Sequence, residues 1–599
     1  MRLLAAVLAI LALPAAALPQ RSAPISDVRY RLQFDAAHAL QRSIGVSMSF
    51  TVRGDEPVLL SMPVWTPGAY EVSDYARNVS GFSAAAGNRA LLWDKLDPDT
   101  WRIWPEGARA VTVRFEARAD SLDNAFNWAT ENFALINGTG VFLYPEGQPL
   151  EFASSVTVQT EPSWRVTSGL AFAKGTFSAP TYHELVDGPF FVGQFDLDST
   201  KVAGRTMRLA TYPVGSVTGA RRETLWTALA KAVPTEAKVF GEVPWTTYTV
   251  MQIADSSYGG GMSALEHQNS NVGVVGSGYL DEPFVPSVYA HEIFHAWNVK
   301  RLRPLDLWPY RYGTAQPTTW LWVSEGITDY YADLALVRGG VITAERFRAL
   351  TQEKMDHVAQ LPPVALEDAS LEAWLRITDG TNGIYYDKGS LAGLALDILI
   401  RDASDNSASL DQVMHDLYAT AYKAGRGFTG DEWWAAVSRA AGGASFRDFN
   451  ARYIDGRVAY PWNDWLKRAG WRVVSDTLQR VRLGAVLAPD SGGLRVSEVG
   501  AASVAQRAGV RVGDVIVRVE GIPASDPAFA EKWRARLESH LNGSFTIEVR
   551  RDGVPTTLRG VATPVTLVNT RVEDDPAASA MAARIRDGIL TGTVQTKRP

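Results

Sequence analysis

The chain has 599 residues, of which 46% are hydrophobic, so it can bury several cores and lacks the composition of a disordered or fibrous protein. Its 59 basic and 65 acidic side chains give a formal charge of −6 without a basic block, which gives no indication of a nucleic-acid or anionic-membrane partner. Because the chain has no cysteine, disulfides are excluded and stability must come from packed cores and bound metal.

Residues 1–20 have the order of a secretory signal peptide. One arginine precedes an apolar run that begins at Leu3, and small residues follow at Ala15 to Ala17. We predict cleavage near Ala17, because the run is shorter than the ~20 apolar residues that span a bilayer. An uncleaved anchor helix is the alternative. The expected location is the bacterial periplasm or the medium, without stable membrane insertion after cleavage.

Two patterns divide the next part of the chain. Residues 26–203 contain short alternating runs such as VRYRLQF and AVTVRFEARA, separated by turn sequences such as RGDEP. This alternation predicts antiparallel strands, and therefore an all-β N-terminal domain. Helical patterns dominate residues 204–472, with a strand at TTYTVMQIAD, which predicts an α+β domain.

The segment YAHEIFHAWNVKRLRP carries two of the chain's eight histidines, four positions apart. In a helix that begins near Pro286, His291 and His295 lie one turn apart on one face and can bind a single ion. Glu292 follows the first histidine, where it can reach a water on the metal and act as general base. The spacing therefore predicts a hydrolytic metal site.

The third metal ligand is predicted on the next helical stretch, TTWLWVSEGITDYYADLALV. A catalytic zinc ion usually takes three protein ligands and leaves a fourth position open. Glu325, thirty residues after His295, completes a His, His, Glu set for one Zn²⁺ per chain. Asp329, one turn later, is placed to accept a hydrogen bond from a ligand histidine. The alternative is that both acidic residues belong to a solvated helix face.

The C-terminal part predicts a further small domain. The stretch Ala508 to Gly521 resembles the core pattern of PDZ domains, and we place this domain at residues 478–565. LGAVL, residues 483–487, would be its carboxylate-binding loop, where a peptide or protein C-terminus adds as a strand. A small β-rich packing domain is the alternative. Residues 566–599 are predicted to be a weakly ordered C-terminal tail.

Several separate stretches resemble the glycyl aminopeptidase family of gluzincin zinc metallopeptidases: MPVWTPGAYEVSDYARNV, LVDGPFFVG, HEIFHAWNVKRLRP and WVSEGITDYYADL. The resemblance implies a multidomain fold with an N-terminal all-β domain, a thermolysin-like α+β catalytic domain and a C-terminal PDZ domain. It also implies an aminopeptidase that prefers N-terminal glycine or alanine.

The same resemblance implies two more site residues. GIYYDKGSLAG is similar to a Y-x-K-G segment of gluzincin aminopeptidases, which makes Tyr386 the hydroxyl that stabilises the oxyanion, with Tyr385 as the alternative. YGGGMSALEHQNS is similar to the element whose glutamate binds the substrate's free amine, which implies that role for Glu266. The spacing between Met262 and this glutamate departs from the family pattern, and His267 replaces the usual asparagine.

These observations predict an exported zinc aminopeptidase that acts on peptides with a free N-terminus. A PDZ-guided endopeptidase on the same scaffold is one alternative. The other is a non-catalytic peptide-binding or chaperone-like protein, which the presence of all three ligands and of Glu292 disfavours.

Overall fold

The computed structural model describes residues 21–259 and 261–595, so the predicted signal peptide lies outside the described residues. The chain forms two compact units, Met1–Trp471 together with Asp574–Pro599, and Arg472–Glu573. Within the described ranges, no helix is both long enough and apolar enough to cross a membrane.

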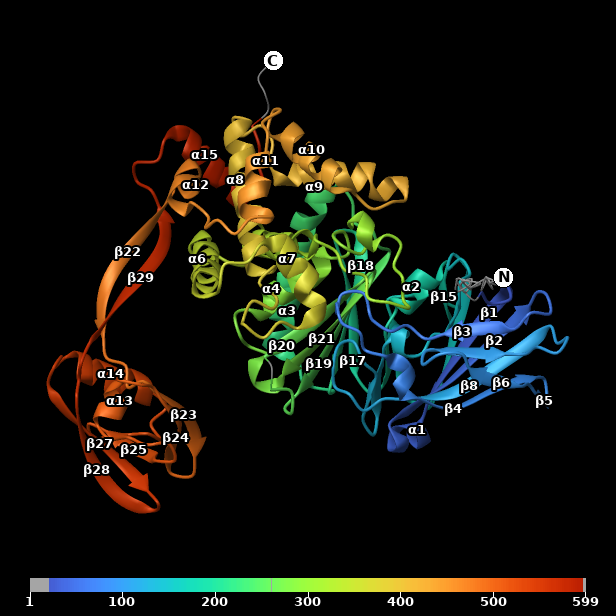
Figure 1. The fold of residues 1–599 in the computed structure, drawn as a ribbon, viewed down its shortest axis with the longest axis horizontal. Helices are drawn as coiled ribbons and strands as arrows, with labels where there is room; N and C mark the ends of the chain where they lie inside the picture. The colour runs from blue at the N-terminus through green and yellow to red at the C-terminus, as the bar shows by residue number, and fades with distance from the viewer. Residues whose placement is uncertain (1–20, 260, 596–599) are drawn as a thin grey trace, which may run out of the picture. The chain divides into compact units, whose positions relative to one another are not determined.

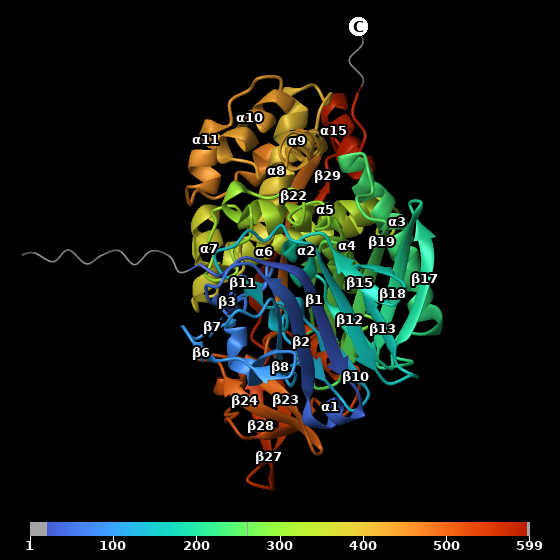
Figure 2. The ribbon, with the colours of Figure 1, turned by 90° about the vertical axis from the view of Figure 1, so that its right-hand side faces the viewer.

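The N-terminal part is built on one large sheet (Figure 2). Buried and exposed side chains alternate along its strands, so one face meets the core and the other meets solvent. Only the contact between β1 and β12 is parallel among the pairings of this sheet. The strand order is β14 (Ala171–Ala173), β15 (Thr176–Ala179), β12 (Ser154–Thr160), β1 (Ile25–Phe34), β2 (Ser43–Val52), β8 (Ala110–Arg118), β4 (Val79–Ala86) and β5 (Arg89–Ala90).

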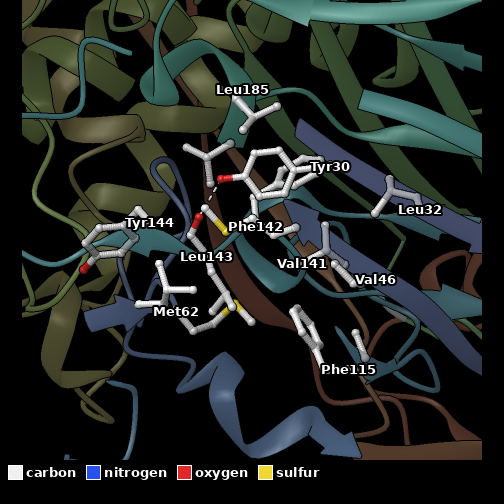
Figure 3. Packing of buried hydrophobic residues seen from close by; sticks show 14 of the residues in the cluster. Tyr30, Leu32, Val46, Met62, Phe115, Val141, Phe142, Leu143, Tyr144 and Leu185 are labelled. Atoms are coloured by element: carbon white, nitrogen blue, oxygen red, sulfur yellow. Dashed lines mark hydrogen bonds between the residues drawn. The ribbon is translucent and has the colours of Figure 1, made fainter. Parts of the chain in front are cut away.

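Two smaller sheets cover the inner face of the large one. Figure 3 shows the core between these layers, where the Tyr30 hydroxyl donates a hydrogen bond to the Leu143 carbonyl at 2.7 Å. The first small sheet has the order β13 (Arg165–Ser168), β16 (Phe190–Gly193), β10 (Phe133–Ile136) and β9 (Trp128–Ala129). The second has the order β11 (Tyr144–Pro145), β3 (Val58–Ser61), β7 (Thr100–Ile103) and β6 (Trp93–Lys95).

The part of the chain predicted to be catalytic begins with a five-stranded sheet whose central strands β18, β19 and β21 are parallel. Its order is β17 (Asp196–Val202), β18 (Arg205–Tyr212), β19 (Thr247–Asp255), β21 (Ser270–Gly276) and β20 (Met262–His267). Strands β19 and β21 are buried almost throughout, as expected where both faces are covered.

Helices pack against this sheet and against one another (Figure 1). Helix α8 is buried nearly all round, which is the pattern of a helix at the centre of a domain. The longer helices are α3 (Gly219–Phe240), α4 (Val285–Phe294), α5 (Ile327–Arg338), α6 (Ala344–Gln360), α7 (Leu366–Glu372), α8 (Asp387–Ala403), α9 (Leu410–Thr420), α10 (Gly430–Ala440) and α12 (Trp462–Arg468).

The second unit has its own apolar core around Trp533, Phe545 and Ile547. Between strand β23 and helix α14 lies a cavity of about 820 Å³ that includes Gly484 and Leu487 of the predicted carboxylate-binding loop. The helices and strands of the second unit are β23 (Ala485–Asp490), β24 (Gly493–Val499), α13 (Val504–Arg507), β25 (Val515–Val519), β26 (Ile522–Pro523), α14 (Phe529–Glu538), β27 (Ser544–Arg551) and β28 (Val554–Val561).

The prediction of a weakly ordered tail is wrong for residues 566–595. Strand β29 (Val565–Asp574) pairs with β22 (Trp471–Arg480), and helix α15 (Ala580–Thr591) packs on α5 and α8 of the first unit. Ile585 and Ile589 are fully buried, and the buried Arg401 guanidinium donates to the Thr593 carbonyl at 2.8 Å. The burial of these apolar side chains and the hydrogen bond to the buried Arg401 offset the conformational entropy that is lost when this segment becomes ordered. The second unit is thus an insertion in the first.

Candidate metal centre and active site

Helix α4 presents the two histidines from its C-terminal end. A proline in its first turn has no N–H to leave unpaired, and the helix packs on β20 and on α5. His291 lies in the last turn, and His295 is the residue directly after the last helical position. The Trp297 ring, fully buried beyond the helix end, stacks on Phe240 of α3 with ring centroids 5.5 Å apart. This packing fixes the helix end that carries the imidazoles.

The three predicted ligands lie together. The Nε2 atoms of His291 and His295 are 2.9 Å apart, and Glu325 Oε2 lies 3.4 Å from the first and 3.2 Å from the second. All three side chains are buried. Although burial disfavours its charge, the two imidazoles hold the pKa of Glu325 below its usual range. The structure therefore brings one carboxylate and two ring nitrogens to a single point.

These donor atoms fit a metal ion. His295 Nδ1 lies 2.7 Å from the Asn298 carbonyl, to which it can only donate, so in the neutral ring Nε2 carries the lone pair. That lone pair faces Nε2 of His291 and an anionic oxygen inside a buried site, an arrangement that needs a cation. Two imidazoles and one carboxylate are the donor set of a catalytic zinc site with an open position.

Glu325 occupies a π-helical turn, Trp322–Gly326, directly before α5. The Asn298 amide holds this turn, because it donates to the Val323 carbonyl at 2.8 Å and to Thr328 Oγ1 at 2.9 Å. A Cβ atom at Gly326 would lie 2.5 Å from Gly389 Cα. Only glycine allows this approach of α5 to the start of α8, and single π turns are common at functional sites.

Glu292 lies beside the ligands and is buried. Its Oε2 atom has no hydrogen-bond partner within the described part of the chain. Burial raises the pKa of Glu292 to about 7, and the charges of His291 and His295 oppose that rise. A carboxyl group with this pKa is suited to accept a proton and to release it again near neutral pH.

Of the two candidate tyrosines, Tyr386 is the one beside the ligands. Its ring centroid lies 5.8 Å from that of His291, and Glu325, Glu266 and Glu292 all act on its pKa. Burial and these carboxylates raise the pKa of Tyr386 well above its usual value, so the hydroxyl stays a proton donor. The Tyr385 ring packs against it at an interplanar angle of 32°, with centroids 4.9 Å apart.

Asp329 lies behind His291, with its Oδ1 atom 3.7 Å from His291 Nδ1. The half-buried Lys354 of α6 contacts Asp329 and binds Asp333 Oδ2 at 2.7 Å and Ser390 Oγ at 2.8 Å. Burial opposes the ionisation of Asp329, but Lys354 and the imidazole hold its pKa below the usual range. An ionised carboxylate thus faces the outer nitrogen of His291.

Glu266 lies on β20 in a second buried charge cluster. Its Oε1 atom is 3.7 Å from Lys300 Nζ, which is also 3.0 Å from Asp187 Oδ1. His267 does not approach the metal ligands in this arrangement; its Nδ1 atom lies 3.2 Å from Asp187 Oδ1. Glu266 is also packed against the N-terminal domain, because a Cβ atom at Gly68 would lie 2.5 Å from Glu266 Oε2.

Sequence reasoning assigned no role to four residues of these clusters. They are Tyr70, Asp187, Lys300 and Lys354. The first three lie within stretches on which the family resemblance rests, WTPGAY, LVDGPFF and NVKRLRP. The signal was therefore present, but nothing in a sequence indicates which distant side chain such a residue contacts.

Comparison with protein families identifies three regions. Residues 29–194 match the Peptidase M61 N-terminal domain, residues 285–392 match the M61 glycyl aminopeptidase, and residues 495–551 match a PDZ domain. A search of curated proteins found no match.

A solved structure with a TM-score of 0.75 shares the fold. A crystal structure of an aminopeptidase N family protein from Idiomarina loihiensis has 23% sequence identity and a TM-score of 0.75, covering 94% of this chain and 100% of the other. An M1 zinc metallopeptidase variant from Deinococcus radiodurans, bound to a Tyr-Ser-Ala substrate, has 16% identity and a TM-score of 0.48, covering 74% and 96%.

The matched domains and the clustered donor atoms define a metallopeptidase. Separate regions of the chain match the Peptidase M61 N-terminal domain, the M61 glycyl aminopeptidase and, after them, a PDZ domain. The resemblance found in the sequence and the predicted multidomain fold class are therefore confirmed.

Proposed function

We propose that the protein is a zinc aminopeptidase that releases N-terminal glycine or alanine from peptides. The observation that carries this proposal is the position of Glu266, a buried carboxylate whose Oε1 atom lacks a hydrogen-bond partner among the described residues. A buried carboxylate oxygen without a hydrogen bond is costly, and the cation nearest to it, Lys300 at 3.7 Å, is shared with Asp187.

The charges around Glu266 support binding of a cation. Glu266 and Asp187 carry two negative charges and Lys300 carries one positive charge, which leaves one negative charge uncompensated. Burial opposes the charge on Lys300, but the two carboxylates raise its pKa above the usual value, so it remains protonated. A substrate ammonium group would restore neutrality, whereas an acylated N-terminus would not.

The preference for small N-terminal residues is supported by the packing around Glu266. The loop that contains Gly68 lies directly against its carboxylate, and Tyr310 and Tyr386 are both close enough to Tyr70 to raise the pKa of Tyr70. Aromatic side chains and a close backbone leave little space for a large substrate side chain.

Each residue of the site has a separate role in the proposed reaction. When bound to His291, His295 and Glu325, a zinc ion supplies a Lewis acid that polarises the scissile carbonyl and lowers the pKa of water. Glu292 takes the proton of the attacking water and passes it to the leaving amine. The Tyr386 hydroxyl donates a hydrogen bond to the developing oxyanion.

The roles of base and ligand can be separated by two variants. Glu292→Gln should keep about one zinc ion per chain and lose most activity, because it removes only the base. His295→Ala should lose both zinc and activity, because it removes a ligand. Metal analysis beside a peptidase assay tests both. Full activity of Glu292→Gln would end the proposed mechanism.

The role of Glu266 predicts dependence on a free amine. Native protein should cleave Gly- and Ala-initiated peptides faster than Leu-initiated ones and should not cleave their N-acetylated forms. Glu266→Ala should lose about 100-fold in kcat/KM, or about 3 kcal/mol, for free-amine substrates, in line with one charge-assisted contact. Equal cleavage of acetylated and free peptides by native protein would favour the endopeptidase alternative.

Export to the periplasm or the medium remains part of the proposal. It is supported by the apolar run and small residues of the N-terminal segment. N-terminal sequencing of protein recovered from the periplasmic fraction should give a start near residue 18, and recovery of uncleaved chain from the cytoplasm would contradict export.

A further inference from the structure

Tyr70 reaches from the N-terminal β domain to a metal ligand of the catalytic domain. Its hydroxyl donates a hydrogen bond of 2.6 Å to Glu325 Oε1, and the residue is buried with 5% of its surface exposed. The two residues are separated by 255 positions in the chain. The N-terminal domain therefore contacts the metal site directly.

This contact gives the two carboxylate oxygens of Glu325 different partners. Oε1 is occupied by the Tyr70 hydroxyl, whereas Oε2 faces the Nε2 atoms of His291 and His295. Rotation of the carboxylate would break a short hydrogen bond to a charged acceptor, which is among the stronger types. The Tyr70 hydroxyl thus fixes the orientation of the Glu325 carboxylate, so that Oε2 is the oxygen available to a metal ion.

Tyr70 is the donor in this contact, because its hydroxyl carries the proton and the Glu325 carboxylate can only accept. Burial raises the pKa of Tyr70 well above its usual value, and the neighbouring carboxylates of Glu325 and Glu266 raise it further. Because the neutral hydroxyl has one proton, the anionic oxygen of Glu325 is its acceptor.

The loop around Tyr70 is held in a strained conformation. Tyr70 has a φ of 49°, which is rare for a bulky side chain, and such outliers persist where surrounding contacts determine them. The Trp65 ring N–H donates to the Arg311 carbonyl at 2.7 Å, and Lys300 Nζ donates to the Pro67 carbonyl at 3.2 Å. The catalytic domain therefore anchors the segment that leads into Tyr70 at two points, Trp65 and Pro67.

We infer that Tyr70 is a positioning residue that orients Glu325 for metal binding, so that the N-terminal β domain completes the metal site. The inference rests on the proposed zinc site but not on the proposed substrate. Partners that orient a metal ligand typically account for about 10- to 100-fold in metal affinity.

The test is zinc affinity in the full-length protein, measured by competition with a chromogenic chelator and without substrate. Tyr70→Phe removes only the hydroxyl and should weaken zinc binding about 10-fold or more. Replacement of Tyr70 by 4-aminophenylalanine, which keeps the ring and supplies an N–H donor, should restore most of the affinity.

Tyr30→Phe is the matched control, because it removes another buried hydroxyl of the same domain that donates to a backbone carbonyl. It should leave zinc affinity within about threefold of native, a difference of less than 1 kcal/mol. Native affinity in Tyr70→Phe, an equal loss in both variants, or an unfolded Tyr70→Phe protein would each overturn the positioning role. A native protein that binds no zinc would instead contradict the proposed metal site.

Discussion

Lys354 is a half-buried cation whose partners explain its position. Two carboxylates and a hydroxyl surround its ammonium group, and one of these carboxylates, Asp329, lies behind the ligand His291. Burial opposes the charge, but the two aspartates raise the pKa of Lys354 above its usual value. A buried ion pair of this kind specifies geometry more than it adds stability.

Removal of Lys354 should therefore affect both stability and metal binding. Lys354→Met leaves the buried carboxylate of Asp333 and the half-buried one of Asp329 without their cation, which should cost about 2 kcal/mol of unfolding free energy and lower zinc affinity about 10-fold. Chemical denaturation and chelator competition measure the two effects. Lys423→Met, which removes an exposed lysine paired with Glu242, is the control and should change stability by less than about 1 kcal/mol. Native zinc affinity in Lys354→Met would separate Lys354 from the metal site.

At the scale of elements, sequence spacing was sufficient for the helix that carries the histidines, because a period of 3.6 residues fixes which side chains share a face. The position of Glu325 followed from the ligand count, but its π-helical turn did not, since the contacts that hold it come from Asn298 and Gly389. Helix α15 was missed because its amphipathic pattern is short and its burial depends on α5 and α8.

Helix α3 carries a buried carboxyl group, Glu236, that the reaction does not use. It is 1% exposed, and neither oxygen has a hydrogen-bond partner in the described residues. Burial raises the pKa of Glu236 well above 4.5, and the charge of His291 opposes this only in part. The Glu236 carboxyl is therefore still neutral in the folded protein at pH values at which it is ionised in the unfolded chain.

This difference predicts a pH-dependent stability. Below pH 4.5 the Glu236 carboxyl is neutral in both the folded and the unfolded state, so the stability that its raised pKa contributes is fully present. As pH rises towards the folded-state pKa, only the unfolded chain releases this proton, and the unfolding free energy falls by about 1.4 kcal/mol per pH unit. Glu236→Gln should remove this loss, so its melting temperature should exceed the native value at pH 8 but not at pH 4.5 in metal-free protein. Glu223→Gln, an exposed change on the same helix, should show no such trend. A pH-independent effect of Glu236→Gln would contradict the assignment.

At the scale of the whole molecule, the N-terminal and catalytic domains form one compact unit, because Tyr70 and Asp187 of the first contact Glu325 and Lys300 of the second. The sequence predicted the order of the domains but not these contacts, which join residues far apart in the chain. It also predicted only a weakly ordered tail after the PDZ domain, whereas α15 returns there to the first unit.

Because the PDZ domain is an insertion, its excision and a truncation of the chain before it should give different results. The Asp575 N–H donates to the Gly470 carbonyl at 2.8 Å, so the chain enters and leaves the inserted unit at neighbouring points. Excision of residues 473–573 with a short Gly-Ser linker should therefore leave a folded protein that cleaves a small N-terminal chromogenic substrate within about tenfold of native, or 1.4 kcal/mol in the barrier. Truncation after Arg472 should instead destabilise the first unit, since it removes α15 and exposes the side chains that this helix covers. Thermal denaturation and the activity assay distinguish the two. An excised protein that is folded and binds zinc but is inert would show that the PDZ domain contributes to the active site.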